Sequence, residues 1–233
     1  MSNSPIILAV DTDDFSTAQK WVGELSPFLG AYKLGLEFFL RFGADGVRQI
    51  QSITDLPLFL DLKLHDIPNT VAAATSQIAD LKPKFLTVHA SGGAEMISRA
   101  VAQVPDTAIT AVTVLTSLSD SELPLLGFAH SALATATALA KHATSAGARA
   151  IVCSPLEISS IRKVVPATVS IITPGVRPAS MQGGDDQSRT MTPTDAMTAG
   201  ANYLVIGRPI TREWANGISA MSRAAQQILR EIS

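Results

Sequence analysis

Short apolar runs alternate with helix-compatible stretches from one end of the chain to the other. Each run has the length of a strand and is rich in Val, Ile, Leu and Ala, as is typical of parallel strands buried on both faces. Polar residues follow each run, at the point where a strand would leave the core. The eight runs cover residues 6–11, 31–36, 58–63, 85–89, 109–115, 150–154, 169–173 and 203–207.

The stretches between these runs predict helices. They cover residues 16–25, 44–52, 70–81, 95–104, 129–146, 155–164 and 194–199, and a final helix is expected over 213–232. Eight strand–helix units of roughly 25 to 30 residues predict an α/β fold, a (β/α)8 TIM barrel, as a single domain over residues 1–233. The alternative is a doubly wound open sheet, which usually has fewer strands and a glycine fingerprint after the first one. Residues 11–14 follow the first run here and contain no glycine.

Two strand-to-helix connections are longer than the others. They cover residues 116–128, after the fifth run, and 174–193, after the seventh. In a barrel the active site lies on the face built by these connections, and long loops in compact domains often cover binding sites. Segment 174–193 contains Gly183 and Gly184 in a polar stretch, so we expect it to be a closing lid.

The bulk composition narrows the class of protein. Hydrophobic residues make up 46% of the chain and aromatic residues only 5%, which indicates an aliphatic core. The formal net charge of -2 gives no electrostatic reason to expect nucleic acid or an anionic membrane as a partner. Any phosphate binding must therefore be local.

Cysteine content and hydropathy bear on the compartment. Cys153 is the only cysteine and lies in an apolar run, which excludes an intrachain disulfide and predicts a buried core thiol. No apolar run approaches the ~20 residues that a membrane-spanning helix needs. Residues 6–10 are followed by Asp11 and are interpreted as a first strand rather than a signal peptide. We therefore expect a soluble, cytoplasmic protein.

The most informative segment is the charged end of the third run. Residues 58–60 are apolar, and Asp61 and Lys63 follow with one residue between them. Because successive side chains on a strand point to opposite faces, Asp61 and Lys63 share one face. Pro68 ends the pairing and leaves Asp66 in or near the following turn. A structural salt-bridge network is one interpretation, but buried ion networks stabilise poorly compared with apolar packing, and clustered charges are often kept for chemistry.

Polar residues also end the other runs, and in a closed barrel they converge on one mouth. Simpler interpretations exist for several of them. Asp11 could cap the first helix, and Lys33 could extend its ammonium group to solvent. His65 and His89 could be hydrogen-bonded structural residues. The full set is Asp11, Lys33, Asp61, Lys63, Asp66, His89, Thr116, Ser117, Thr173, Arg177, Gly207 and Arg208.

Gly207 and Arg208 predict a phosphate site at the end of the last run. Glycine lets backbone N–H groups approach a ligand, and arginine offers a bidentate fork. Many barrels build a phosphate site from the loops after strands seven and eight, so Arg177 and Gln187 are expected to complete it. A surface arginine beside a tight turn is the alternative. The sequence has no metal-ligand pattern of His, Cys or Glu, no P-loop and no dinucleotide motif.

Residues 59–70 read Phe-Leu-Asp-Leu-Lys-Leu-His-Asp-Ile-Pro-Asn-Thr, and this motif is joined by stretches at 88–93, 114–117, 152–154, 173–177, 186–189 and 206–210. Together they resemble the orotidine 5′-phosphate decarboxylase family over nearly the whole chain. The resemblance implies conversion of orotidine 5′-phosphate to UMP and CO2, the last step of de novo pyrimidine biosynthesis, without a metal or organic cofactor.

The resemblance also implies roles for the charge cluster. Lys63 matches the general acid that protonates C6 of the pyrimidine, and Asp61 matches the carboxylate that faces the departing carboxylate of the substrate. Lys33 and Asp66 match the other members of an alternating charge network. Asp66 and Thr70 match residues that reach across a dimer interface into the partner's site, so a homodimer is expected.

The same resemblance implies the substrate contacts. Asp11 and Lys33 match residues that hold the ribose hydroxyls, and Thr116 matches a contact near the pyrimidine. The residues that match the phosphate grip are Gln187, Gly207 and Arg208, with Arg177 beside them.

Two other functions stay open from the sequence. The spacing Asp-x-Lys-x-x-Asp also occurs in sugar-phosphate relatives of the same barrel superfamily, so an Mg²⁺-dependent sugar-phosphate decarboxylase or aldolase is one alternative. The other is a catalytically silent barrel that binds a phosphorylated ligand as a sensor or scaffold. The intact group of Asp61, Lys63 and Asp66 argues against the silent barrel.

Overall fold

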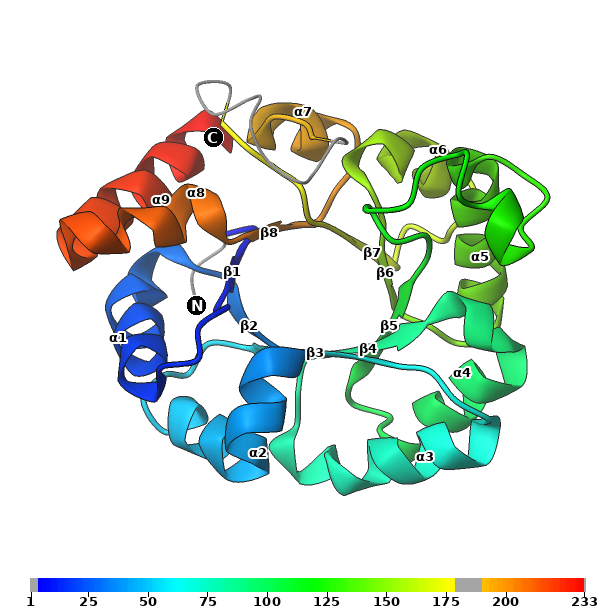
Figure 1. Ribbon diagram of the computed structural model, residues 1–233, viewed down its shortest axis with the longest axis horizontal. Coiled ribbons are helices and arrows are strands. Elements are labelled where there is room, and N and C mark those ends of the chain that lie inside the picture. Colours follow the sequence, from blue (N-terminus) through cyan, green and yellow to red (C-terminus); the bar gives the residue numbers. More distant parts are fainter. Residues whose placement is uncertain (1–3, 179–189, 233) are drawn as a thin grey trace.

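Eight parallel strands close into a barrel in the computed structural model, which describes residues 4–178 and 190–232. Each strand pairs with the next, and β8 pairs with β1 (Figure 1). This arrangement confirms the predicted (β/α)8 barrel and excludes the open sheet. The strands are β1 (Ile6–Ala9), β2 (Ala31–Gly35), β3 (Leu58–Leu64), β4 (Phe85–His89), β5 (Ala108–Val112), β6 (Ala150–Val152), β7 (Ser170–Thr173) and β8 (Tyr203–Ile206).

Helices form a ring around the barrel and cover the outer face of the sheet (Figure 1). The α-helices are α1 (Phe15–Leu25), α2 (Leu36–Gln51), α3 (Pro68–Gln77), α4 (Gly93–Gln103), α5 (Ala132–Ser145), α6 (Ile158–Arg162), α7 (Pro193–Thr198), α8 (Arg208–Thr211) and α9 (Ile218–Ile232). The 3-10 helices are η1 (Ser26–Phe28), η2 (Ala79–Leu81), η3 (Ala90–Gly92), η4 (Pro124–Leu126), η5 (Pro155–Glu157) and η7 (Arg212–Asn216). In the part of the chain that the structure describes, no helix has the length and apolar character needed to span a membrane.

At two of the places where the helices differ from the expectation, a glycine redirects the backbone. Helix α2 begins at Leu36 rather than at residue 44, and it kinks at Gly43, where φ is 62° and ψ is -165°. The helix expected over 213–232 is instead η7 followed by α9, since Gly217 adopts φ 88° between them. Both φ values lie in the left-handed region that glycine enters at little cost.

The interior of the barrel is packed with apolar side chains near the amino-terminal ends of the strands. This inner cluster consists of Ile7, Ala31, Phe59, Phe85, Ala150 and Ile172. The rings of Phe59 and Phe85 meet edge to face at a centroid distance of 5.7 Å, a favourable aromatic geometry. Two residues further along β3, the inward side chain is no longer apolar but is the carboxylate of Asp61. The packed layer therefore forms the floor of the space that lies at the carboxyl ends of the strands.

Strand β3 is irregular where its charged residues begin. Leu60 pairs with Leu86, and the next pair along is Leu64 with Val88, so β3 advances four residues while β4 advances two. Lys63 lies in this bulge with φ 48°, a conformation that is uncommon for a residue other than glycine. The sequence predicted regular alternation here, and the bulge corrects that expectation.

Candidate active site

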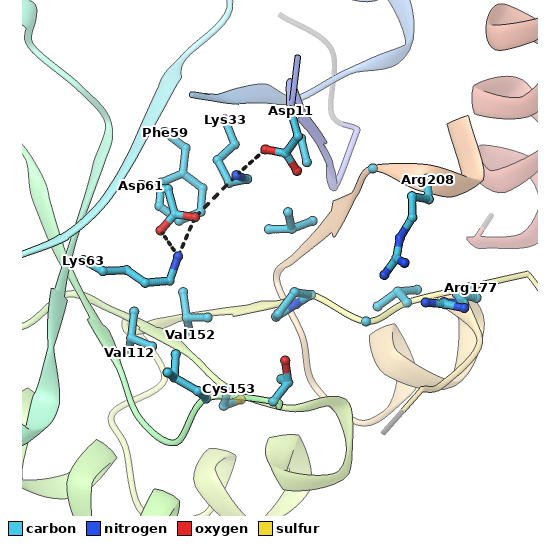
Figure 2. Close-up of a pocket in the computed structure, with 18 of the residues that line it drawn as sticks. Asp11, Lys33, Phe59, Asp61, Lys63, Val112, Val152, Cys153, Arg177 and Arg208 are labelled. Carbon is cyan, nitrogen blue, oxygen red and sulfur yellow. Dashed lines mark hydrogen bonds and ion pairs between the residues drawn. The ribbon is translucent and has the colours of Figure 1, made fainter. Parts of the chain in front are cut away.

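A cavity of 290 Å³ opens at the carboxyl ends of the strands. Figure 2 shows charged side chains on two of its sides, with apolar side chains between them. The cavity lies above the packed floor, as expected for a barrel whose loops at this end form the site. The residues lining it are Ala9, Asp11, Lys33, Phe59, Asp61, Lys63, Val112, Val114, Leu115, Thr116, Val152, Cys153, Pro174, Gly175, Val176, Arg177, Val205, Gly207, Arg208 and Pro209.

Four charged side chains form a continuous row of alternating sign along one side of the cavity. Lys33 Nζ lies 3.0 Å from Asp11 Oδ1 and 3.4 Å from Asp61 Oδ2. Lys63 Nζ donates to both carboxylate oxygens of Asp61 at 2.9 Å. The row runs Asp11, Lys33, Asp61, Lys63 (Figure 2), and it joins side chains from the ends of the first three strands. The structure thus brings together four of the residues singled out from the sequence.

Burial and charge act in opposite directions on this row. Desolvation alone would raise the pKa of the buried Asp61 carboxyl, but the ammonium groups of Lys33 and Lys63 hold that pKa below its usual value. Desolvation alone would lower the pKa of Lys33, but Asp11 and Asp61 raise it above the usual value. Both groups are therefore held in their charged forms inside the cavity before any ligand arrives.

Two arginines lie on the side of the cavity away from Lys63. Figure 2 shows Arg177, which follows β7, and Arg208, which follows β8, next to each other there. Arg177 is buried. Gly207 precedes Arg208, and a Cβ atom built on it would lie 3.3 Å from Ala9 Cβ, so a larger residue would crowd the cavity wall. This end offers concentrated positive charge for an anionic group, and an anion bound there would be separated from the Asp61 carboxylate by the width of the cavity.

Apolar side chains fill the remaining wall between the two charged ends. Val112 and Val152 contribute to it, and Cys153 and Thr116 also line the cavity. The thiol of Cys153 is fully buried in a strand-end position. A flat, uncharged ring fits such a wall, with its polar substituents toward the charged ends.

Asp66 and Thr70 do not line the cavity of their own chain. Both are exposed, and Asp66 Oδ1 accepts the N–H of Ile67. They lie past the end of β3, in the turn and in the first part of α3. Gln187 lies outside the residues that the structure describes, as does most of the segment 174–193 that the sequence predicted to be a lid.

Thr87 was not identified from the sequence. It is fully buried on β4, and its hydroxyl accepts the backbone N–H of Lys63 at 2.8 Å and donates to Asp61 Oδ1 at 3.0 Å. Its position two residues after Phe85, on the inward face of a predicted strand, was the available signal. Threonine is so common in strands that this signal carries little weight without the structure.

The two histidines near the site contact each other rather than the cavity. The rings of His65 and His89 have a centroid distance of 5.2 Å. Partial burial, together with the nearby His65 and Lys63, lowers the pKa of His89. Among residues 4–178 and 190–232, no three His, Cys, Asp or Glu side chains are grouped so that they could hold a metal ion.

Comparisons with known proteins show which family this chain is similar to. Residues 4–222 match the family described as orotidine 5′-phosphate decarboxylase / HUMPS. The orotidine 5′-phosphate decarboxylase of Thermobifida fusca is 48% identical over 223 residues, covering 96% of this chain and 95% of that protein. The enzyme of that name from Wolbachia pipientis is 43% identical over 232 residues, covering 99% of both. The crystal structure of orotidine 5′-phosphate decarboxylase from Lactobacillus acidophilus aligns with a TM-score of 0.83 and 33% identity, covering 99% of each chain.

Proposed function

This chain belongs to the orotidine 5′-phosphate decarboxylase / HUMPS family, and on that premise we propose that it is a carboxy-lyase that converts orotidine 5′-phosphate to UMP and CO2. The observation that carries the proposal is the alternating row of Asp11, Lys33, Asp61 and Lys63 at one end of the cavity. The arginines at the other end provide for the phosphate, and the apolar wall between them accommodates a pyrimidine.

Lys63 supplies the chemical step in this proposal. Loss of CO2 from the orotate ring leaves an electron pair at C6 with no adjacent carbonyl group to delocalise it. An ammonium group fixed beside that carbon stabilises negative charge as it develops, and so acts on the transition state more than on the ground state. The proton then passes from Lys63 Nζ to C6. Lys63 is already held at 2.9 Å from Asp61, so little reorganisation is needed.

Asp61 has two roles in the proposed mechanism. Its carboxylate orients the Lys63 ammonium group, and it faces the substrate carboxylate, whose negative charge it repels until CO2 leaves. Lys33 holds Asp61 from the other side and, with Asp11, contacts the ribose hydroxyls. Because enzymes lower barriers by roughly 8 to 23 kcal/mol, one lysine is insufficient, and binding energy from the rest of the substrate must contribute.

The phosphate is the main source of that remote binding energy. Arg208 and the backbone at Gly207 bind it, and Arg177 lies beside them. Gln187, which lies outside the described residues, also binds the phosphate in this proposal. Phosphate binding closes segment 174–193 over the substrate and excludes water from the cavity. Thr116, which also lines the cavity, contacts the pyrimidine.

A homodimer completes the site in this proposal. Asp66 and Thr70 are exposed and flank Ile67, whose exposed fraction is 67%, so they are available to a second copy of the chain. In the dimer they enter the partner's cavity and extend its charged row. The protein is expected to work in the cytoplasm and without a cofactor.

The direct test is a spectrophotometric assay with purified protein. Orotidine 5′-phosphate should be consumed, with loss of its ultraviolet absorbance, in the presence of EDTA. Strict dependence on Mg²⁺, with turnover of a sugar phosphate instead, would favour the decarboxylase or aldolase alternative. Binding of the nucleotide without turnover would favour the silent barrel.

A further inference from the structure

Thr87 lies on β4, directly opposite the bulge in β3. Between the pairs Leu60–Leu86 and Leu64–Val88, strand β3 has three residues and β4 has only Thr87. The regular backbone ladder is therefore interrupted where Asp61 and Lys63 stand. A buried N–H group that loses its ladder partner needs another acceptor.

The side chain of Thr87 takes over that function. Its Oγ1 accepts the N–H of Lys63 at 2.8 Å, and its hydroxyl hydrogen points to Asp61 Oδ1 at 3.0 Å. A single buried hydroxyl thus connects the backbone of one charged residue to the carboxylate of the other. Each hydrogen bond uses a different capacity of the hydroxyl, one as acceptor and one as donor.

The conformation that Thr87 supports is an unfavourable one. Lys63 adopts φ 48° without being a glycine, and residues in this region persist only where their surroundings hold them. In that conformation Nζ of Lys63 returns to within 2.9 Å of both oxygens of Asp61. If the N–H of Lys63 were released, the backbone could relax, and the ammonium group would move relative to the cavity.

We propose that Thr87 is a positioning residue for decarboxylation, whose hydroxyl holds the Lys63 backbone in its bulged conformation and fixes the Asp61 carboxylate against the Lys63 ammonium group. This inference rests on the proposed function. Thr87 does not line the cavity, so it acts through Lys63 and Asp61 and touches no substrate.

A neighbouring threonine shows that burial in the barrel does not by itself connect a threonine hydroxyl to the charged row. Thr110 is its direct partner on β5 and is equally buried. The hydroxyl of Thr110 donates to the carbonyl of Ala108, on its own strand, and its removal would leave the charged row untouched. Thr110 is therefore a matched control for the loss of one buried hydroxyl from the barrel interior.

The kinetic test compares Thr87→Val, Thr87→Ser and Thr110→Val. Valine keeps the shape of threonine and lacks both hydrogen bonds, so kcat should fall by about tenfold or more while KM changes by less than about threefold. Serine keeps the hydroxyl and should restore most of kcat. Thr110→Val should have nearly wild-type kcat. A Thr87→Val enzyme with wild-type kcat, or a serine variant as impaired as the valine variant, would overturn the proposal.

A second measurement does not depend on activity. Hydrogen exchange of the Lys63 amide, followed by NMR, should be faster in Thr87→Val than in wild type and unchanged in Thr87→Ser and Thr110→Val. Equal exchange in all four proteins would refute the positioning role. If the wild-type protein has no decarboxylase activity, the proposed function fails, and the exchange rates still decide whether Thr87 holds Lys63. If Thr87→Val does not fold, Thr87→Cys, whose thiol is a weaker donor and acceptor, takes its place in both tests.

Discussion

Lys63 Nζ lies 2.9 Å from each carboxylate oxygen of Asp61, although only one residue separates the two in β3. The ammonium group is therefore held in place by the protein before a substrate enters. Preorganised charge of this kind is usually the largest single contribution to catalysis, because it needs no rearrangement as the transition state forms.

Replacing Lys63 by alanine removes the proposed proton donor. The variant should keep less than about a tenth of the wild-type kcat, a loss above ~1.4 kcal/mol, while UMP binding stays measurable by calorimetry. Lys141→Ala, which removes an exposed lysine from α5, is the control and should have normal kcat. A Lys63→Ala enzyme with more than a tenth of wild-type kcat would contradict the role.

Arg208 should act on the phosphate and not on the ring. A charge-assisted hydrogen bond is worth about 1.5–3 kcal/mol, so Arg208→Ala should lower kcat/KM for orotidine 5′-phosphate by roughly 10- to 150-fold. The nucleoside orotidine lacks the phosphate, and its slow turnover should be nearly unchanged. Arg223→Ala, on the exposed face of α9, is the control. Equal losses with both substrates would show that Arg208 does not bind the phosphate.

The dimer proposal can be tested by mixing two inactive variants. Asp66→Ala should impair the partner's site, and Lys63→Ala should impair its own. After subunit exchange, heterodimers would contain one intact site, so an equal mixture should recover roughly a quarter of wild-type activity in an isologous dimer. If Asp66 serves its own chain, or if the protein is a monomer, the mixture stays inactive. Size-exclusion chromatography of the wild-type protein distinguishes these two outcomes.

Asp61 should make the stability of the folded protein depend on pH in the acidic range. Burial alone would raise the pKa of the Asp61 carboxyl, but Lys33 and Lys63 lower this pKa in the folded state. The contribution of Asp61 to the free energy of unfolding is therefore fully present above about pH 3.9, the usual pKa of an aspartate. This contribution is lost as the pH falls through the pKa of the folded state. The difference in urea midpoint between wild type and Asp61→Asn should be largest near neutral pH and should shrink below about pH 4. Asp55→Asn, at an exposed site, should change little. A difference for Asp61→Asn that is constant down to pH 2.5 would argue against the assignment.

Cys153 should be unreactive in the folded protein. Burial is the main cause that raises the pKa of the Cys153 thiol well above the usual range, and the nearby Glu157 adds to the effect. The thiolate, which is the reactive form, is therefore disfavoured. Iodoacetamide at pH 8 should therefore label the chain in urea and leave the folded protein unmodified, as mass spectrometry can show. Labelling at similar rates in both states would mean that the thiol is accessible through the cavity.

The sequence predicted all eight strands because the core of a barrel requires apolar runs at regular intervals. It also identified Asp11, Lys33, Asp61 and Lys63 as charges at strand ends, and the structure places them in one row. It could not predict the start of α2. Gly43 interrupts the helical period, so the turns of the helix that precede Gly43 were not recognised as helical.

The bulge in β3 could not be predicted for a different reason. Lys63 is not a glycine, and the side chain that stabilises its positive φ is Thr87, which is 24 residues away in the sequence. A contact of this kind depends on the register of two strands, which the local sequence does not specify. The residues that support a site are therefore harder to identify than the charged residues that form it.

This bulge also limits how the site can be transplanted. A designer who copied Asp61 and Lys63 onto a regular strand would reproduce the spacing and the shared face. The copied strand would lack the two additional residues of β3 and the hydroxyl opposite them, so the ammonium group would start from a different backbone position. The smallest unit that can be grafted is consequently a pair of strands, with Thr87 on the second.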